Sequence, residues 1–153
     1  MKLVLIDDEP FHLIGMRTVI PWEQNHFIIV GEARSGEEGI ELILREQPDI
    51  AIVDIVMPGI DGLEMIRRVK DAAPETRFIV LSCMNDIQRY KEAVSLGAAE
   101  YLQKDLETPD VLLETVRRVA QQLKRERLRN SDGEAYTDTA PQMRTEYLNL
   151  LLS

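Results

Sequence analysis

Short apolar runs alternate along this chain with amphipathic stretches of ten or more residues. The runs are rich in Val, Ile and Leu and are almost continuously apolar, which is typical of strands that are covered on both faces of a parallel sheet. They predict five strands, at residues 3–7, 27–32, 50–54, 78–82 and 100–104.

The stretches between these runs predict helices. Ser35 with Glu38 three residues later is the pattern of a capping box, and Gly97 suits a left-handed helix end. The predicted helices cover about residues 10–21, 35–46, 61–72, 85–96 and 108–130. Strands that alternate with helices indicate an α/β domain with a parallel sheet. The polar residues 130–140 are predicted to be a linker, and a short amphipathic segment follows Pro141.

Composition and charge narrow the function classes. A length of 153 residues fits one domain with some chain left over. The net charge of −9 disfavours DNA binding through bulk electrostatics, which needs clustered Lys and Arg. The single cysteine, Cys83, excludes an internal disulfide and fits a reducing cytoplasm. No apolar run approaches 18 residues and no signal peptide precedes the first strand, so we expect a cytoplasmic protein without a membrane span.

Acidic residues stand at the ends of two predicted strands. Asp7 and Asp8 close the first strand, and Asp54 closes the third. Ligands of open parallel sheets bind at the carboxyl ends of strands. Two carboxylates about 4 Å apart repel by roughly 1 kcal/mol in water and about 4 kcal/mol near a protein surface. A site that gathers three of them needs a cation between them or a proton on one of them. A divalent cation with oxygen ligands suits the site best, Mg²⁺ first.

Two further polar residues end strands. Ser82 ends the fourth predicted strand and Lys104 ends the fifth. Three acids, a hydroxyl and an ammonium group suit the transfer of a phosphoryl group onto a carboxylate, because the cations neutralise the phosphoryl oxygens.

These residues resemble the receiver domain of two-component response regulators. The resemblance covers residues 1–125 and is carried by Asp7-Asp8-Glu9-Pro10, Asp54 with Met57-Pro58-Gly59 and Asp61-Gly62, Leu81-Ser82, and Tyr101 with Lys104. It implies a doubly wound, five-stranded parallel sheet of order 2-1-3-4-5, the flavodoxin-like or CheY-like (βα)5 fold.

The resemblance also implies roles for the acidic residues. Asp54 would accept the phosphoryl group. Asp8 would ligate Mg²⁺ directly and Asp7 mostly through water, and the backbone carbonyl of Val56 would be a further ligand.

The remaining site residues would stabilise the phosphoryl group and act as a switch. Lys104 would pair with a phosphoryl oxygen, Ser82 would swing toward it, and Tyr101 would turn inward. This movement would couple the site to the face made by the fourth helix, the fifth strand and the fifth helix.

The implied function is signalling. A sensor histidine kinase would donate the phosphoryl group in a Mg²⁺-dependent reaction, and the domain would catalyse only its own phosphorylation and dephosphorylation. Activation would favour a homodimer and switch an output, expected to be transcription through a DNA-binding domain that is not in this chain.

Residues 20–23, Ile-Pro-Trp-Glu, resemble the corresponding segment of receivers joined to AraC-type helix-turn-helix domains. Residues 126–153 would then be a helix extension, the linker and the start of a missing or truncated output segment. The alternative is a stand-alone receiver that acts by protein–protein interaction.

The chain departs from the family pattern near the site. Asp105 follows Lys104, where family members usually have a proline with a cis bond, so this bond is either trans with a different loop or a strained cis bond. Val56 and Met84 are apolar where related receivers often carry polar groups that position water. We therefore hypothesise slow loss of the phosphoryl group.

Two other functions, a phosphatase and an electron carrier, fit the sequence less well than signalling does. A phosphatase of the haloacid dehalogenase type needs a second acid two residues after its nucleophile, where this chain has Val56. A flavin-binding electron carrier needs a phosphate loop after the first strand, where the acidic run beginning at Asp7 would repel phosphate. His12 and His26 have no clustered metal-binding partners and are expected to be structural or exposed.

Overall fold

The computed structural model describes residues 1–83, 86–104 and 108–137, with side chains described as far as residue 130. Its elements are β1 (Lys2–Ile6), α1 (Pro10–Val19), η1 (Glu23–Asn25), β2 (Ile28–Ala33), α2 (Gly36–Glu46), β3 (Ile50–Asp54), α3 (Gly62–Val69), β4 (Arg77–Ser82), α4 (Ile87–Ser95), β5 (Glu100–Gln103) and α5 (Pro109–Thr137). The five predicted strands are confirmed, each within two residues of its predicted ends.

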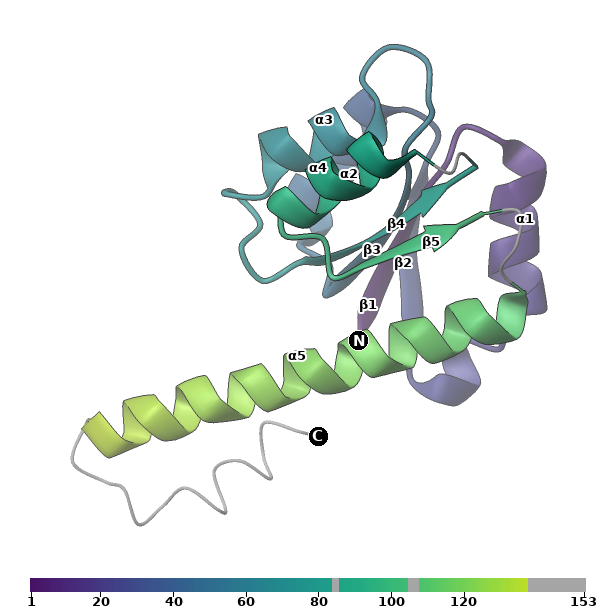
Figure 1. The fold of residues 1–153 in the computed structure, drawn as a ribbon. Helices are drawn as coiled ribbons and strands as arrows, with labels where there is room; N and C mark the ends of the chain where they lie inside the picture. The colour runs from purple at the N-terminus through teal and green to yellow at the C-terminus, as the bar shows by residue number, and fades with distance from the viewer. Residues whose placement is uncertain (84–85, 105–107, 138–153) are drawn as a thin grey trace. The chain divides into compact units, whose positions relative to one another are not determined.

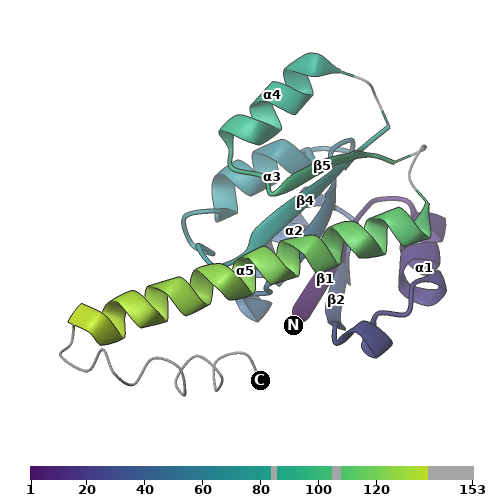
Figure 2. The same cartoon turned by 60° about the horizontal axis from the view of Figure 1, so that its bottom comes forward.

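The strands form one parallel sheet in the order β2-β1-β3-β4-β5. Figures 1 and 2 show α2, α3 and α4 on one face of this sheet and α1 with the first turns of α5 on the other. The predicted doubly wound order 2-1-3-4-5 is therefore confirmed.

The central strands are buried on both faces because helices cover both. Alternate residues of a strand point to opposite faces, and all four residues from Leu3 to Ile6 are inaccessible to solvent. Val4, Ile6 and Val53 belong to the core cluster that includes residues of α2 and α3. This packing explains why the sequences of the strands are continuously apolar and do not alternate between apolar and polar residues.

Side-chain caps begin α2, where Ser35 was predicted to cap, and α3. The Ser35 hydroxyl accepts a hydrogen bond from the Glu38 N–H at 3.1 Å at the start of α2. In a capping box the Glu38 carboxylate would accept from the Ser35 N–H. Here it accepts from the N–H of the preceding residue, Arg34. Asp61 caps α3 by accepting from the Glu64 N–H at 2.8 Å.

The fifth helix is longer than predicted. The helix continues to Thr137, so the prediction of a linker was wrong for residues 131–137. Once a helix is nucleated, each further residue adds one hydrogen bond, and a single Gly133 costs only about 1 kcal/mol relative to alanine. The rest of the predicted linker and the amphipathic segment after Pro141 lie outside the described residues.

The chain divides into two compact units, Met1–Arg117 and Arg118–Ser153. The first unit contains the sheet, α1 to α4 and the beginning of α5. Within the described ranges, no helix is both long and apolar enough to cross a lipid bilayer.

A close backbone approach at Gly62 fixes the loop that follows β3. The Gly62 N–H donates to the Ile55 carbonyl at 2.9 Å. A Cβ atom at this position would collide with the backbone carbonyl oxygen of Asp54 and lie 2.8 Å from Val53 Cγ1. Glycine is therefore required here so that the first turn of α3 can pack against the end of β3.

We predict that Gly62→Ala lowers the free energy of unfolding by about 1–3 kcal/mol, because backbone atoms cannot move aside as a flexible side chain can. Gly15→Ala is the matched control, since nothing lies within 4 Å of a Cβ added in α1. It should raise stability by about 0.5–1 kcal/mol. Urea unfolding of both variants measures the difference, and equal effects would contradict the proposed steric role.

Candidate functional site

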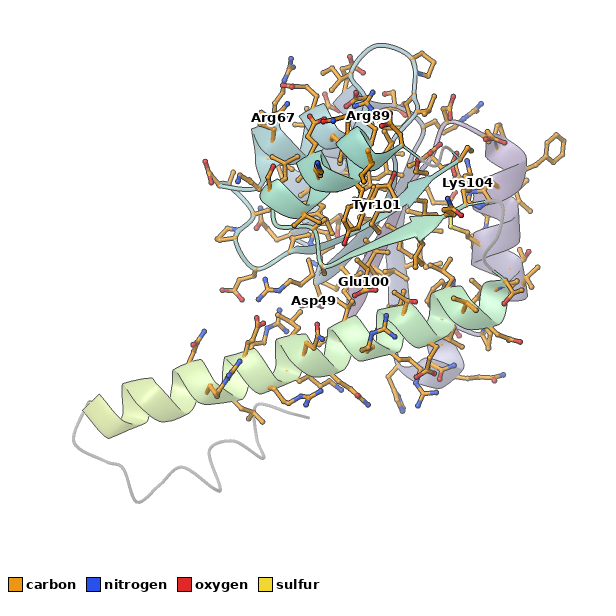
Figure 3. The ribbon with its side chains drawn as sticks, in the orientation of Figure 1. Asp49, Arg67, Arg89, Glu100, Tyr101 and Lys104 are labelled. Atoms are coloured by element: carbon orange, nitrogen blue, oxygen red, sulfur yellow. The ribbon has the colours of Figure 1, made fainter. Side chains whose placement is uncertain are left out.

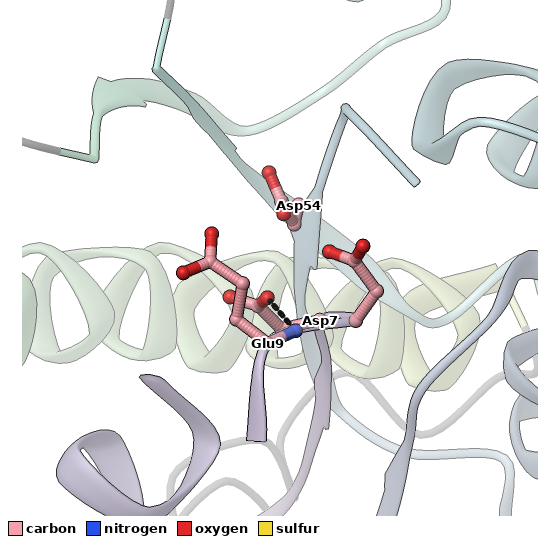
Figure 4. Close-up of side chains that lie close together, drawn as sticks. Asp7, Glu9 and Asp54 are labelled. Atoms are coloured by element: carbon pink, nitrogen blue, oxygen red, sulfur yellow. Dashed lines mark hydrogen bonds between the residues drawn. The ribbon is translucent and has the colours of Figure 1, made fainter. Parts of the chain in front are cut away.

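The pairing of β1 with β3 brings two aspartates together at the carboxyl edge of the sheet. Ile6 pairs with Val53, so the next residues, Asp7 and Asp54, follow on neighbouring strands (Figure 4). Both side chains are almost completely buried, with exposed fractions of 0% for Asp7 and 2% for Asp54. Burial of two neighbouring carboxylates is costly unless a cation or a proton compensates them.

The acidic cluster contains one more residue than the predicted site. Asp7, Asp8, Glu9 and Asp54 each offer a carboxylate oxygen, and these oxygens lie within 4.8 Å of one another. Glu9 was quoted in the family motif but was not predicted as a site residue. Its position directly after two predicted ligands was the available signal.

Lys104 is the positive charge at the centre of this cluster. Its ammonium group lies 2.8 Å from Glu9 Oε1, 3.0 Å from Asp7 Oδ2 and 3.2 Å from Asp54 Oδ2, and only 5% of its side chain is exposed. Figure 3 shows Lys104 at the end of β5. Burial alone would lower the pKa of Lys104, but its contacts with Glu9 and Asp7 raise it above its usual value, so the lysine is fully charged.

Asp7 is held by several donors. Its Oδ1 accepts from the Glu9 N–H at 2.9 Å, and its Oδ2 contacts Nδ1 of His12. Burial opposes ionisation of Asp7, but the hydrogen bonds with His12, the Glu9 N–H and Lys104 hold its pKa below the ordinary value. The expectation of a merely structural or exposed His12 was therefore incomplete, because His12 contacts a carboxylate of the site.

Ser82 ends β4, and Tyr101 is the second residue of the neighbouring strand β5. Ser82 is buried at the end of β4, and its carbonyl accepts from the Lys104 N–H at 2.7 Å. The Tyr101 ring stands edge-on to the Tyr90 ring of α4, with centroids 5.4 Å apart. The Tyr101 hydroxyl is buried and has no hydrogen-bond partner among the described residues. The polar end of Tyr101 thus lies inside the protein in this structure.

Val56 is the second residue of the loop between β3 and α3. Its side chain is apolar and 52% exposed. The only polar groups that Val56 can offer to the acidic site are therefore those of its backbone. The ends of this loop are fixed by the Gly62 contact described above and by Asp61, whose Oδ2 lies 3.0 Å from Arg89 Nη1 of α4. The Lys104–Asp105 bond and Met84 lie outside the described residues.

Comparison with known proteins agrees with this arrangement. The family model described as "Response regulator receiver domain" matches residues 3–117.

The chain belongs to the response regulator receiver domain family.

Relatives of this receiver domain include transcriptional regulators. It is 38% identical over 125 residues to the "Uncharacterized transcriptional regulatory protein YesN" of Bacillus subtilis, an alignment that covers 82% of this chain and 34% of the relative. It is 36% identical to the "Nitrate/nitrite response regulator protein NarL" of Escherichia coli over 72% of this chain and 50% of that protein. The receiver domain therefore spans only a third to a half of the length of these two relatives.

Solved receiver domains have the same fold. The REC domain of the response regulator AraT from Geobacillus stearothermophilus matches with a TM-score of 0.75 and 33% identity, covering 82% of this chain and 97% of that one. The signal receiver domain of the putative response regulator NarL from Mycobacterium tuberculosis matches with a TM-score of 0.72 and 30% identity, covering 78% and 95%. By its family the receiver domain is a signalling module.

The residues of the receiver domain's acidic cluster fit a hard divalent cation. Asp54 Oδ1 is buried and has no hydrogen-bond partner among the described residues. Burial and then the charge of Asp7 raise the pKa of Asp54 to about 6. An unpaired, buried carboxylate oxygen beside three other carboxylates is a suitable ligand set for an oxygen-coordinated cation.

We predict that Asp54→Asn stabilises the metal-free receiver domain in a pH-dependent way. The folded-state pKa of about 6 exceeds the ordinary value of 3.8, so the folded state binds the Asp54 proton more tightly than the unfolded state. The wild type therefore loses stability relative to the variant as the pH rises from about 4 to about 6, by roughly 2–3 kcal/mol in total.

Urea unfolding in EDTA across pH 4 to 7.5 measures this difference. Asp71→Asn, which changes an exposed carboxylate, is the control and should show no such trend. A stability difference between Asp54→Asn and the wild type that stays constant with pH would refute the assignment.

Proposed function

We propose that Asp54 accepts a phosphoryl group from a sensor histidine kinase in a Mg²⁺-dependent reaction. The observation that carries this proposal is the setting of Asp54: a carboxylate with 2% exposure, 3.2 Å from the ammonium of Lys104 and beside three further acids. The P–N bond of the kinase phosphohistidine, whose other ring nitrogen carries a proton, breaks and a P–O bond to the ionised Asp54 carboxylate forms, which leaves a neutral imidazole with that proton on the kinase.

Mg²⁺ would be held by Asp8 directly, by Asp7 mostly through water, and by Asp54 and the backbone carbonyl of Val56. When bound, it supplies positive charge that neutralises the phosphoryl oxygens. Asp7 is suited to an indirect role because His12, the Glu9 N–H and Lys104 already engage its two oxygens.

Lys104 and Ser82 are positioned to stabilise the transferred group. The ammonium of Lys104 already lies beside Asp54, so it can pair with a phosphoryl oxygen after a small movement. Ser82 stands one register position beyond Leu81, which pairs with Asp54. The switch would run from Ser82 to Tyr101, whose ring contacts Tyr90 of α4.

An apolar cavity of about 250 Å³ lies beside the site and supports docking of a kinase domain there. Lys104 and His12 line both this cavity and the acidic site, and the Phe11 side chain next to them is 87% exposed. The cavity is lined by Phe11, His12, Gly15, Met16, Val19, Ile20, Leu81, Lys104, Thr108, Pro109 and Leu112. A partner that covers it would bring its phosphohistidine to the rim of the site and exclude water.

The output is proposed from the relatives. The names of the two relatives described above are those of a transcriptional regulatory protein and a response regulator, and the receiver domain spans only part of each. We propose that residues 1–125 form the receiver, that residues 126–153 lead into an output segment, and that activation favours a cytoplasmic homodimer that controls transcription through a DNA-binding domain, of AraC type, outside this chain. A stand-alone receiver that acts by protein contacts is the alternative.

Incubation with a small phosphodonor and MgCl₂, followed by intact mass, tests the core of the proposal. We predict a gain of one phosphoryl group that is abolished in Asp54→Ala, because the acceptor carboxylate is removed, and that is abolished by EDTA. Asp71→Ala should be phosphorylated like the wild type. Equal phosphorylation of Asp54→Ala and the wild type would rule out Asp54 as the acceptor.

We predict that Val56→Asn speeds dephosphorylation. An amide at this exposed position can hydrogen-bond an attacking water, and one such bond of about 1 kcal/mol corresponds to about a fivefold rate. Val19→Asn, at a similarly exposed valine of α1, is the control. The hypothesis of slow phosphoryl loss fails if the phosphorylated Val56→Asn protein decays at the wild-type rate.

A further inference from the structure

Glu9 differs from the other acids of the site in its exposure. Its side chain is 60% exposed, whereas Asp7 and Asp54 are buried. Its backbone is fixed because its N–H donates to Asp7 (Figure 4), and its carboxylate contacts the ammonium group of Lys104. Asp8 is half-buried, so Glu9 is the most exposed acid of the cluster toward a molecule arriving from solvent.

The contact of Glu9 with Lys104 is the shortest that this lysine makes with the site acids. The distance is 2.8 Å, compared with 3.0 Å to Asp7 and 3.2 Å to Asp54. An ammonium group has three N–H donors, and these three carboxylates account for all of them. Since Lys104 is 5% exposed and its three donors are engaged, an anion from solvent that pairs with this ammonium has to replace one of the carboxylates, and Glu9 is the exposed one.

The net charge of the site also indicates that Glu9 opposes the approach of an anion. Four carboxylates and one ammonium sum to −3, and a divalent cation leaves −1. Without the charge of Glu9 the metal-loaded site would be neutral. An incoming phosphodonor is itself an anion, so Glu9 turns a neutral entrance into a repulsive one.

We propose that Glu9 determines donor specificity: its carboxylate occupies Lys104 at the solvent side of the site and disfavours free anionic phosphodonors in proportion to their charge. This inference rests on the proposed function of Asp54. A phosphohistidine brought by a docked protein gains binding energy elsewhere and can displace Glu9, whereas a small donor has no such compensation.

The reaction used to test this inference is phosphoryl transfer from two small donors. With acetyl phosphate, the bond between phosphorus and the acyl oxygen breaks, a P–O bond to Asp54 forms, and acetate leaves. With phosphoramidate, whose nitrogen is protonated, the P–N bond breaks, the same P–O bond forms, and neutral ammonia leaves. At pH 7 phosphoramidate carries about one negative charge fewer than acetyl phosphate.

The experiment compares Glu9→Gln with the wild type at saturating Mg²⁺. Removal of one negative charge about 5 Å from the donor should speed phosphorylation about fourfold for each charge on the donor, so acetyl phosphate should gain about fourfold more than phosphoramidate. The gain should shrink between 0.05 and 0.5 M NaCl, because salt screens the repulsion. Glu41→Gln, which removes an exposed carboxylate in α2, is the control for net charge and should leave both rates unchanged.

A binding measurement separates the entrance effect from the chemistry. Titration of the Mg²⁺-loaded proteins with sulfate, an unreactive dianion, should show tighter binding to Glu9→Gln than to the wild type. Equal acceleration for both donors, an acceleration that salt does not reduce, the same effect in Glu41→Gln, or unchanged sulfate affinity would overturn the role of Glu9. If the intact mass showed no phosphoryl group on Asp54 in either protein, the proposed function itself would fail, and the role of Glu9 with it.

Discussion

The contact of one buried lysine with three carboxylates is the interaction on which this site depends. Asp7 and Asp54 are taken out of water by the packing of β1 against β3, and their mutual repulsion grows as water is excluded. Lys104 reaches them from β5, two strands beyond β3 in the sheet. The sheet therefore has to be complete before the acids are compensated, which links the integrity of the fold to the integrity of the site.

Compensation by one ammonium group is incomplete, and this incompleteness has a functional meaning. Asp54 retains a buried oxygen without a partner among the described residues, and its pKa is raised to about 6. Such a carboxylate is destabilising in the isolated domain, and its buried oxygen suits a cation ligand. Active sites commonly hold groups whose environment is costly for stability and favourable for chemistry.

Tyr101 also has a buried polar group without a hydrogen-bond partner among the described residues. A buried hydroxyl without a partner costs roughly 1–3 kcal/mol, so the inward position of this side chain is not a deep minimum. The edge contact with Tyr90 partly offsets that cost and joins β5 to α4. A conformational switch requires two arrangements that differ little in free energy, and a buried side chain whose polar group is not compensated is suited to the proposed switch role.

The sequence by itself determined the strands, the helices between them and the acids at the ends of β1 and β3, because the period of apolar residues and the caps are local properties. The motif spacing also indicated the family and therefore the strand order. The tertiary structure decided which groups touch. The contact of His12 with Asp7 and the place of Glu9 on Lys104 depend on side chains that meet across β1, α1 and β5, and no pattern along the chain records such distances. The extension of α5 through residues 131–137 was also missed, because the weak helix propensity of a polar segment is overcome by the long helix that precedes it.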